Sequence, residues 1–99
     1  MVKLRYDPEA RAEVIVGAEY YEACREGLGH QFVDAVEAAV RRLRANPLLY
    51  PFMRRPYRRC PVAKFPYSIV YRQDEEGIYV AAVAHGSRKP GYWLDRVEK

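Results

Sequence analysis

The chain has 99 residues, of which 49% are hydrophobic, and a formal net charge of +4. A chain of this length has room for one hydrophobic core, so we expect one domain over residues 1–99. No apolar run approaches the about 20 residues of a membrane span, and no export signal precedes the first strand-like segment, so we expect a cytoplasmic protein without a membrane partner.

The first two predicted elements are a short strand and a helix. Residues 2–6 alternate apolar and basic side chains, a pattern that predicts a strand with one face turned inward. Asp7 and Pro8 mark a helix start, because an aspartate caps free backbone N–H groups and a proline loses nothing at the first helical position. The strand side chains expected to face inward are Val2, Leu4 and Tyr6.

A second helix is expected directly after the first. Gly27 is suited to the left-handed conformation that ends a helix, and the second helix should end near Ala45, because Asn46 precedes a proline and is pushed out of helical geometry. A link this short between two amphipathic helices predicts an antiparallel hairpin. The expected buried positions are Ala10, Val14, Gly17, Ala18, Tyr21 and Cys24 in the first helix, and Phe32, Val36, Ala39, Val40 and Leu43 in the second.

Prolines shape the segment between the second helix and the last strands. Three of them fall within residues 46–56 and predict an irregular connection there. Residues 57–65 are expected to form a strand. Because Pro61 cannot donate a hydrogen bond to a neighbouring strand, this strand should lie at an edge of the sheet or carry a bulge.

Two strands joined by a tight polar turn follow. The first should place Tyr67, Ile69 and Tyr71 on one face. Residues 78–85 are apolar on both parities, which is typical of a strand that is covered on both sides and is therefore central in the sheet. One expected face of that strand carries Ile78, Val80, Ala82 and Ala84, and the other carries Tyr79, Ala81 and Val83.

The predicted order of elements is β-α-α-β-β-β. This order corresponds to an α+β fold with two layers, in which a helical hairpin packs on one face of a small, largely antiparallel sheet. A basic and aromatic tail follows the last strand, and any chemical centre is expected there. Its residues are His85, Arg88, Lys89, Tyr92, Trp93 and Arg96.

The cysteines and histidines do not suggest a metal or redox site. Cys24 and Cys60 lie far apart and lack metal-ligand spacing, so free thiols are expected rather than a disulfide or a redox pair. The two histidines are well separated and have no cysteine or aspartate cluster beside them, so neither a metal nor another cofactor is expected.

Basic residues concentrate in the middle of the chain, whereas acidic residues gather in the first helix and at its ends. This asymmetry favours an acidic partner, either a nucleic acid or an acidic protein segment, and a solvated basic face is an equal alternative. The basic residues of this central segment are Arg41, Arg42, Arg44, Arg54, Arg55, Arg58, Arg59 and Lys64.

Several short motifs accompany this order of elements. They are Tyr20-Tyr21, Gly27-Leu28-Gly29 followed by Phe32, Asn46-Pro47, Tyr50-Pro51, Arg54-Arg55, residues 65–71, and the tail residues His85, Arg88, Pro90, Tyr92, Trp93 and Arg96. Together they resemble the RelE/ParE superfamily of toxins from bacterial type II toxin–antitoxin modules. The resemblance runs from the first helix to the tail and is greatest with the ParE-like, plasmid-stabilisation branch.

The resemblance implies a toxin that a cognate antitoxin neutralises with an extended, acidic C-terminal segment, which calls for a groove with basic and apolar walls. ParE-like members poison DNA gyrase by binding it and are not enzymes, and we take this as the leading interpretation. RelE-like members cut mRNA on the ribosome without a metal, so a ribosome-dependent mRNA endoribonuclease is the alternative. A further alternative is a domain that binds the antitoxin but has lost toxicity.

The nuclease alternative assigns roles to four residues. Arg88 and Tyr92 fall where RelE-like toxins carry a catalytic arginine and tyrosine, and Lys64 lies near their catalytic lysines. His85 would be a general acid or base, or it would simply bond a neighbouring backbone group. Ser68 stands where the RelE-like motif has a phosphate-binding arginine. The nuclease gains support if Lys64, Arg72, Arg88 and Tyr92 converge on one concave surface.

The remaining candidate residues are assigned to binding of the target or the antitoxin. For Trp93 the alternative is a structural role, in which it pins the tail to the sheet. The candidate binding residues are Arg54, Arg55, Arg58, Arg59, Arg72, Trp93 and Arg96.

Overall fold

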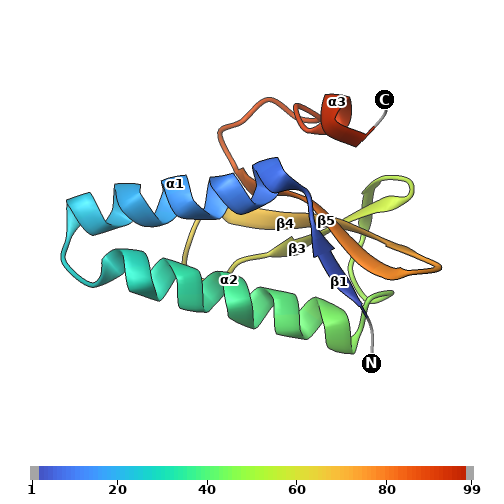
Figure 1. Ribbon diagram of the computed structural model, residues 1–99, viewed down its shortest axis with the longest axis horizontal. Helices are drawn as coiled ribbons and strands as arrows, with labels where there is room; N and C mark the ends of the chain where they lie inside the picture. Colours follow the sequence, from blue (N-terminus) through green and yellow to red (C-terminus); the bar gives the residue numbers. More distant parts are fainter. Residues whose placement is uncertain (1–2, 98–99) are drawn as a thin grey trace.

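The computed structural model describes residues 3–97. These residues form a mixed sheet with a helical hairpin on one face (Figure 1). The strand order is β1-β5-β4-β3-β2, in which β1 runs parallel to β5 and the other neighbours are antiparallel. The predicted α+β fold with two layers is confirmed. The elements are β1 (Leu4–Tyr6), α1 (Pro8–Cys24), α2 (Leu28–Ala45), β2 (Phe52–Arg54), β3 (Tyr57–Pro61), β4 (Tyr67–Asp74), β5 (Gly77–His85) and α3 (Leu94–Val97).

The start of α1 is capped as predicted. One carboxylate oxygen of the buried Asp7 accepts a hydrogen bond from the Glu9 N–H at 2.9 Å. The other oxygen accepts a hydrogen bond from the Tyr79 hydroxyl at 2.8 Å, so one side chain both caps the helix and joins it to β5. Among residues 3–97, no helix has the length and apolar character that would let it cross a membrane.

Glycine residues allow the two helices of the hairpin to pack closely where they are joined. Gly27 precedes α2 in the left-handed conformation, with a φ of 86°, as predicted. A Cβ atom on Gly29 would lie 2.4 Å from the backbone oxygen of Ala18, so a larger residue does not fit there. The predicted burial of Cys24 is wrong, because the last turn of α1 extends past the sheet and leaves this free thiol exposed (Figure 1).

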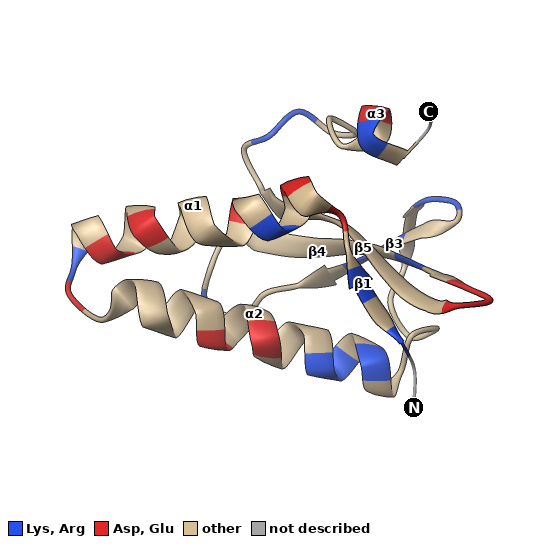
Figure 2. Cartoon of the chain, viewed as in Figure 1, with Lys and Arg blue, Asp and Glu red and all other residues tan. Residues whose placement is uncertain are grey.

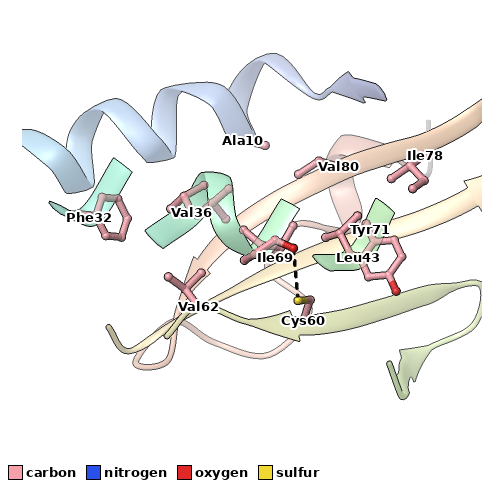
Figure 3. Packing of buried hydrophobic residues seen from close by; sticks show 12 residues of the cluster. Ala10, Phe32, Val36, Leu43, Cys60, Val62, Ile69, Tyr71, Ile78 and Val80 are labelled. Carbon is pink, nitrogen blue, oxygen red and sulfur yellow. Dashed lines mark hydrogen bonds between the residues drawn. The ribbon is translucent and has the colours of Figure 1, made fainter. Parts of the chain in front are cut away.

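The main core lies between the helical hairpin and the sheet (Figure 3). All five predicted core residues of α2 are buried, and Tyr67, Ile69 and Tyr71 of β4 face this core, as predicted. The second cysteine, Cys60, is a buried free thiol whose Sγ lies 3.8 Å from the Ala39 carbonyl oxygen. A smaller cluster forms on the other face of the sheet from Tyr57, Val70, Ala81, Ala82 and Trp93.

A β-bulge in β5 changes which side chains face the helices. Val70 of β4 pairs with Ala82 and Tyr71 pairs with Val80, so Ala81 is an extra residue. The predicted regular alternation along this strand is therefore wrong beyond Val80. Val83 joins the main core under the helices, and Ala81 and Ala82 both belong to the cluster on the opposite face.

Two further predictions of local structure need correction. Residues 46–56 are not wholly irregular, since β2 forms within them and pairs with β3. β3 does not lie at the edge of the sheet, because β2 pairs with it, and the register shift in that pairing falls in β2, between Phe52 and Arg54. Pro61 is tolerated because it is the last residue of β3. The short helix α3 lies in the tail and was not predicted. Val2, which was expected to face inward, lies outside the described residues.

An ion pair between Arg5 of β1 and Asp74, at the end of β4, connects the β4–β5 turn to β1. Arg5 Nη2 lies 2.6 Å from Asp74 Oδ1, and this hydrogen bond is the main reason why the pKa of Asp74 lies below its usual value. A carboxyl group whose pKa is lowered by folding adds stability above its unfolded pKa of about 3.9, and that stability is lost as the pH falls through the folded pKa.

We therefore expect Asp74→Asn to lower the midpoint of thermal unfolding at neutral pH but to have little effect at pH 2. Thermal unfolding of both proteins from pH 2 to pH 7 measures this difference. An equal loss of stability at every pH would contradict a contribution from the ionised carboxylate.

Candidate functional site

The tail after β5 folds back beside the N-terminal half of α1, on the side away from α2 (Figure 1). Two adjoining hollows form where it does so, and His85, Arg88 and Tyr92 line both of them. The first, which we call the α1-side hollow, has a volume of about 340 Å³. The second, which we call the strand-side hollow, has a volume of about 130 Å³ and opens on the other face of the sheet.

Glu13 of α1 is the centre of the α1-side hollow. Its Oε1 accepts hydrogen bonds from the Val83 N–H and from Arg96 Nη1, both at 3.0 Å. Its Oε2 accepts hydrogen bonds from the Tyr92 hydroxyl at 2.6 Å and from Arg96 Nη2 at 2.8 Å. Arg88 Nη1 lies 3.9 Å from the same oxygen. One carboxylate therefore ties α1, β5 and the tail together.

The same contacts cover an open edge of the sheet. β1 pairs with β5 only as far as Val80, so the edge of β5 beyond that residue has no neighbouring strand. There the Val83 N–H donates to Glu13, and the Ala81 carbonyl oxygen accepts a hydrogen bond from Arg96 Nη1 at 3.2 Å. These two side chains occupy hydrogen-bonding positions that a further strand would use.

Tyr92 is held in its protonated form. Its ring lies between two guanidinium groups, with the Cζ atom of Arg88 3.7 Å and that of Arg96 5.0 Å from the ring centroid. Burial and the hydrogen bond to Glu13 raise the pKa of the Tyr92 hydroxyl far above its usual value. A hydroxyl group in this state does not accept a proton near neutral pH, so Tyr92 is not placed to be a general base.

His85 has the structural contacts that were the alternative to a catalytic role. Its Nδ1 accepts a hydrogen bond from the Ser87 N–H at 2.9 Å, and the Ser87 hydroxyl lies 2.8 Å from the same nitrogen. Its ring meets the edge of Tyr67 with 5.0 Å between centroids. An Nδ1 atom that accepts a hydrogen bond assigns the remaining proton of the neutral ring to Nε2.

The strand-side hollow is basic. Three cations, Arg59, Arg88 and Lys89, line it together with the half-buried Ser68, and no Asp or Glu among residues 3–97 belongs to its lining. The α1-side hollow, in contrast, contains Glu9 and Glu13 opposite its arginines. The two hollows thus share residues but differ in charge.

The four residues that would support a nuclease do not all converge. Arg88 and Tyr92 lie together, as expected, but Lys64 lies in the β3–β4 connection and lines a different hollow, beside α2. Arg72 lies on β4, where its Nη1 donates to the Tyr57 hydroxyl at 3.0 Å and its Nε lies 3.4 Å from Asp74. Neither cation lines the hollows that contain Arg88 and Tyr92.

Comparison with known proteins identifies the family. The model of the ParE toxin of the type II toxin–antitoxin system parDE matches residues 4–90. The chain belongs to the ParE toxin family. No curated protein matches the chain.

A solved structure also resembles this ParE toxin. It is described as a chromosomal ParDE toxin–antitoxin system from P. aeruginosa, and it superposes with a TM-score of 0.65. The alignment covers 86% of this chain and 96% of the other at 15% sequence identity, so the likeness concerns the fold. The ParDE family implies an antitoxin as a partner of this toxin.

Two of the residues assigned to binding have structural positions in this ParE toxin. Trp93 is 1% exposed and packs on Tyr57 with 4.8 Å between ring centroids, so it belongs to the smaller core. The Arg96 side chain is 9% exposed and pairs with Glu13. The alternative prediction, that Trp93 pins the tail to the sheet, is confirmed.

The remaining basic candidates lie on or beside β2 and β3. Arg58 is half-buried and donates to the Tyr50 carbonyl oxygen at 2.7 Å, which fixes the preceding loop. Arg54, Arg55 and Arg59 are exposed. This part of the predicted binding surface is therefore accessible to a partner.

An apolar groove lies between the two helices. It has a volume of about 600 Å³ and runs along α1 and α2 beside β1. Its charged lining residues are Arg11, Glu19 and Glu37, and the Cζ atom of Arg11 lies 4.8 Å from the centroid of Tyr6. The apolar residues that line the groove are Tyr6, Val14, Ile15, Ala18, Val33 and Val36.

Glu13 was not predicted as a site residue. It lies on a face of α1 away from the predicted core stripe, and its partners are 70 to 83 positions away in the chain. No local spacing signals such a contact. Within residues 3–97, no three His, Cys, Asp or Glu side chains are grouped so that they could hold a metal ion.

Proposed function

We propose that this ParE toxin acts by binding and inhibiting DNA gyrase, without cleaving a substrate itself. The observation that supports this proposal is the set of contacts between Glu13 and the tail. The Glu13 carboxylate accepts a hydrogen bond from the protonated Tyr92 hydroxyl and pairs with the guanidinium group of Arg96. Lys64 and Arg72, which a nuclease would need near Arg88, lie elsewhere. A role in contact rather than catalysis fits such a fixed, charge-paired arrangement.

We further propose that the antitoxin neutralises the toxin in the cytoplasm and that the pair contributes to plasmid stabilisation. The groove between α1 and α2 supports this proposal through its apolar lining, although Glu19 and Glu37 line it as well as Arg11. An amphipathic segment would bury its apolar side chains in the groove and direct an acid toward Arg11.

One observation favours the alternative of an mRNA endoribonuclease. The strand-side hollow brings Arg59, Arg88 and Lys89 together without an acid, which suits a phosphate group. Against this, Ser68 lines the hollow with a neutral hydroxyl in place of the arginine of RelE-like toxins.

Induced expression in bacteria separates these functions. We expect growth arrest, intact transcripts at ribosomes and relaxed plasmid DNA, since an inhibited gyrase no longer introduces supercoils. Co-expression of the cognate antitoxin should restore growth. Cleaved transcripts that disappear in an Arg88→Ala variant would contradict the proposal, and normal growth without antitoxin would mean that toxicity has been lost.

A further inference from the structure

The large apolar side chains that are exposed among residues 3–97 form two groups, one on α1 and one before and within β2. The second group is Leu48, Leu49, Phe52 and Met53, which we call the β2 patch. Leu48 and Leu49 are 67% and 70% exposed, and Phe52 and Met53 are 36% and 41% exposed. Single exposed apolar residues are ordinary on protein surfaces, but four exposed within six positions of the chain are unusual.

The loop that carries the two leucines is held in place. The Tyr71 hydroxyl donates to the Pro47 carbonyl oxygen at 2.7 Å, and the Leu49 N–H donates to the Asn46 carbonyl oxygen at 3.1 Å. Arg58 Nη1 donates to the carbonyl oxygens of Tyr50 at 2.7 Å and of Leu48 at 3.3 Å. Side chains of β3 and β4 already hold the backbone of this loop. Binding of a partner would therefore cost little conformational entropy in the loop.

Arginine side chains surround the apolar part of the patch. The Cζ atoms of Arg58 and Arg55 lie 3.8 and 4.2 Å from the centroid of Phe52, so this ring is flanked by two cations. No Asp or Glu occurs between Glu37 and Asp74, although nine of the 17 Lys and Arg residues of the chain fall in that interval. Figure 2 shows this contrast between the basic end of α2 with the loops beyond it and the acidic positions along α1.

We infer that the β2 patch is the surface through which the toxin binds its protein target, and that the target offers an acidic surface with apolar pockets for Leu48, Leu49 and Phe52. This inference rests on the proposed function, because it names the part of the toxin that contacts the inhibited protein. Aromatic residues, methionine and arginine, which the patch combines in Phe52, Met53, Arg55 and Arg58, are enriched at protein–protein interfaces.

Two other occupants fit the patch less well. A second copy of the chain would bring Arg55 and Arg58 against their own equivalents across a two-fold axis, which is repulsive. A nucleic acid would pair with the arginines but would leave two highly exposed leucines with little to contact, since such interfaces are mainly polar. An acidic protein surface satisfies both parts of the patch.

The β2 patch is also distinct from the groove proposed for the antitoxin. Residues 48–53 contribute nothing to the lining of that groove, which consists of residues from β1, α1 and α2. Changes in the patch should therefore separate target binding from antitoxin binding.

The test replaces Leu48 and Leu49 together by serine, and in a second variant replaces Arg55 by glutamate. All three side chains are exposed, so both variants should fold like the parent protein. We expect the toxin concentration that half-inhibits supercoiling by purified gyrase to rise about ten-fold or more in each variant, and growth arrest to weaken in parallel. Affinity for the cognate antitoxin should stay unchanged.

The matched control is Tyr20→Ser, which removes a side chain of 62% exposure from α1 and should alter neither inhibition nor growth arrest. Undiminished growth arrest in both patch variants would overturn the inference, and so would a loss of antitoxin affinity instead of toxicity. If the parent toxin arrests growth but leaves purified gyrase active, the proposed target is wrong. In that case, a comparison of growth arrest between the variants and the parent toxin still tests whether the β2 patch is needed for toxicity.

Discussion

Replacing Glu13 by alanine should lower the free energy of unfolding by about 3–5 kcal/mol, because it removes one partner of a largely buried ion pair and leaves Arg96 only the more distant, exposed Glu9 as an acidic partner. The Arg96 side chain is 9% exposed, and the Val83 N–H and the Tyr92 hydroxyl lose their acceptor as well. Denaturant unfolding measures the loss. Trp93 is the single tryptophan, so its fluorescence reports whether the tail separates from the sheet.

Glu9→Ala is the matched control for this prediction. Glu9 belongs to the same helix and lies 3.7 Å from Arg96 Nε, but its side chain is 67% exposed. An exposed ion pair contributes little, so this variant should differ from the parent by less than about 1 kcal/mol. Equal losses in the two variants would show that Glu13 is not the residue that holds the tail.

Replacing Gly29 by alanine should destabilise the protein by about 2–3 kcal/mol, since overfilling a tight contact forces the backbone to move. The new Cβ atom would lie 2.4 Å from the Ala18 carbonyl oxygen, which belongs to the backbone of α1 and cannot rotate away. Alanine has a helix propensity about 1 kcal/mol more favourable than glycine, and this gain is smaller than the cost of parting the helices. Denaturant unfolding measures the result.

Gly86→Ala is the control for the hairpin contact. A Cβ atom there would lie 3.5 Å from the Pro66 carbonyl oxygen, which is an ordinary contact, so stability should stay close to that of the parent protein. A Gly29→Ala protein that is as stable as the parent, or more stable, would mean that helix propensity outweighs the contact between α1 and α2.

The sequence predicted those parts of the fold that depend on local patterns. The cap at Asp7, the turn at Gly27 and the buried stripe of α2 each follow from residue type and helical spacing. The central position of β5 follows from its apolar character on both parities. The bulge at Ala81 could not be predicted from the sequence. It arises from the pairing of β5 with β4, and a run of small apolar residues gives no signal for it.

The candidate site was predicted in part. His85, Arg88 and Tyr92 lie together because the tail turns directly after β5. Lys64 and Arg72 lie elsewhere, because their positions depend on how β3 and β4 pair, which the sequence does not reveal. Trp93 was difficult to place because an aromatic residue suits both a core and an interface, and here the face of the sheet opposite the helices needed covering.

The most direct test of the central claim, that this ParE toxin acts by contact, is the supercoiling of relaxed plasmid by purified DNA gyrase titrated with purified toxin. We predict that supercoiling falls as toxin is added and returns when cognate antitoxin is added. A gyrase that remains fully active in excess toxin, together with cleavage of mRNA on translating ribosomes by the same preparation, would contradict the claim.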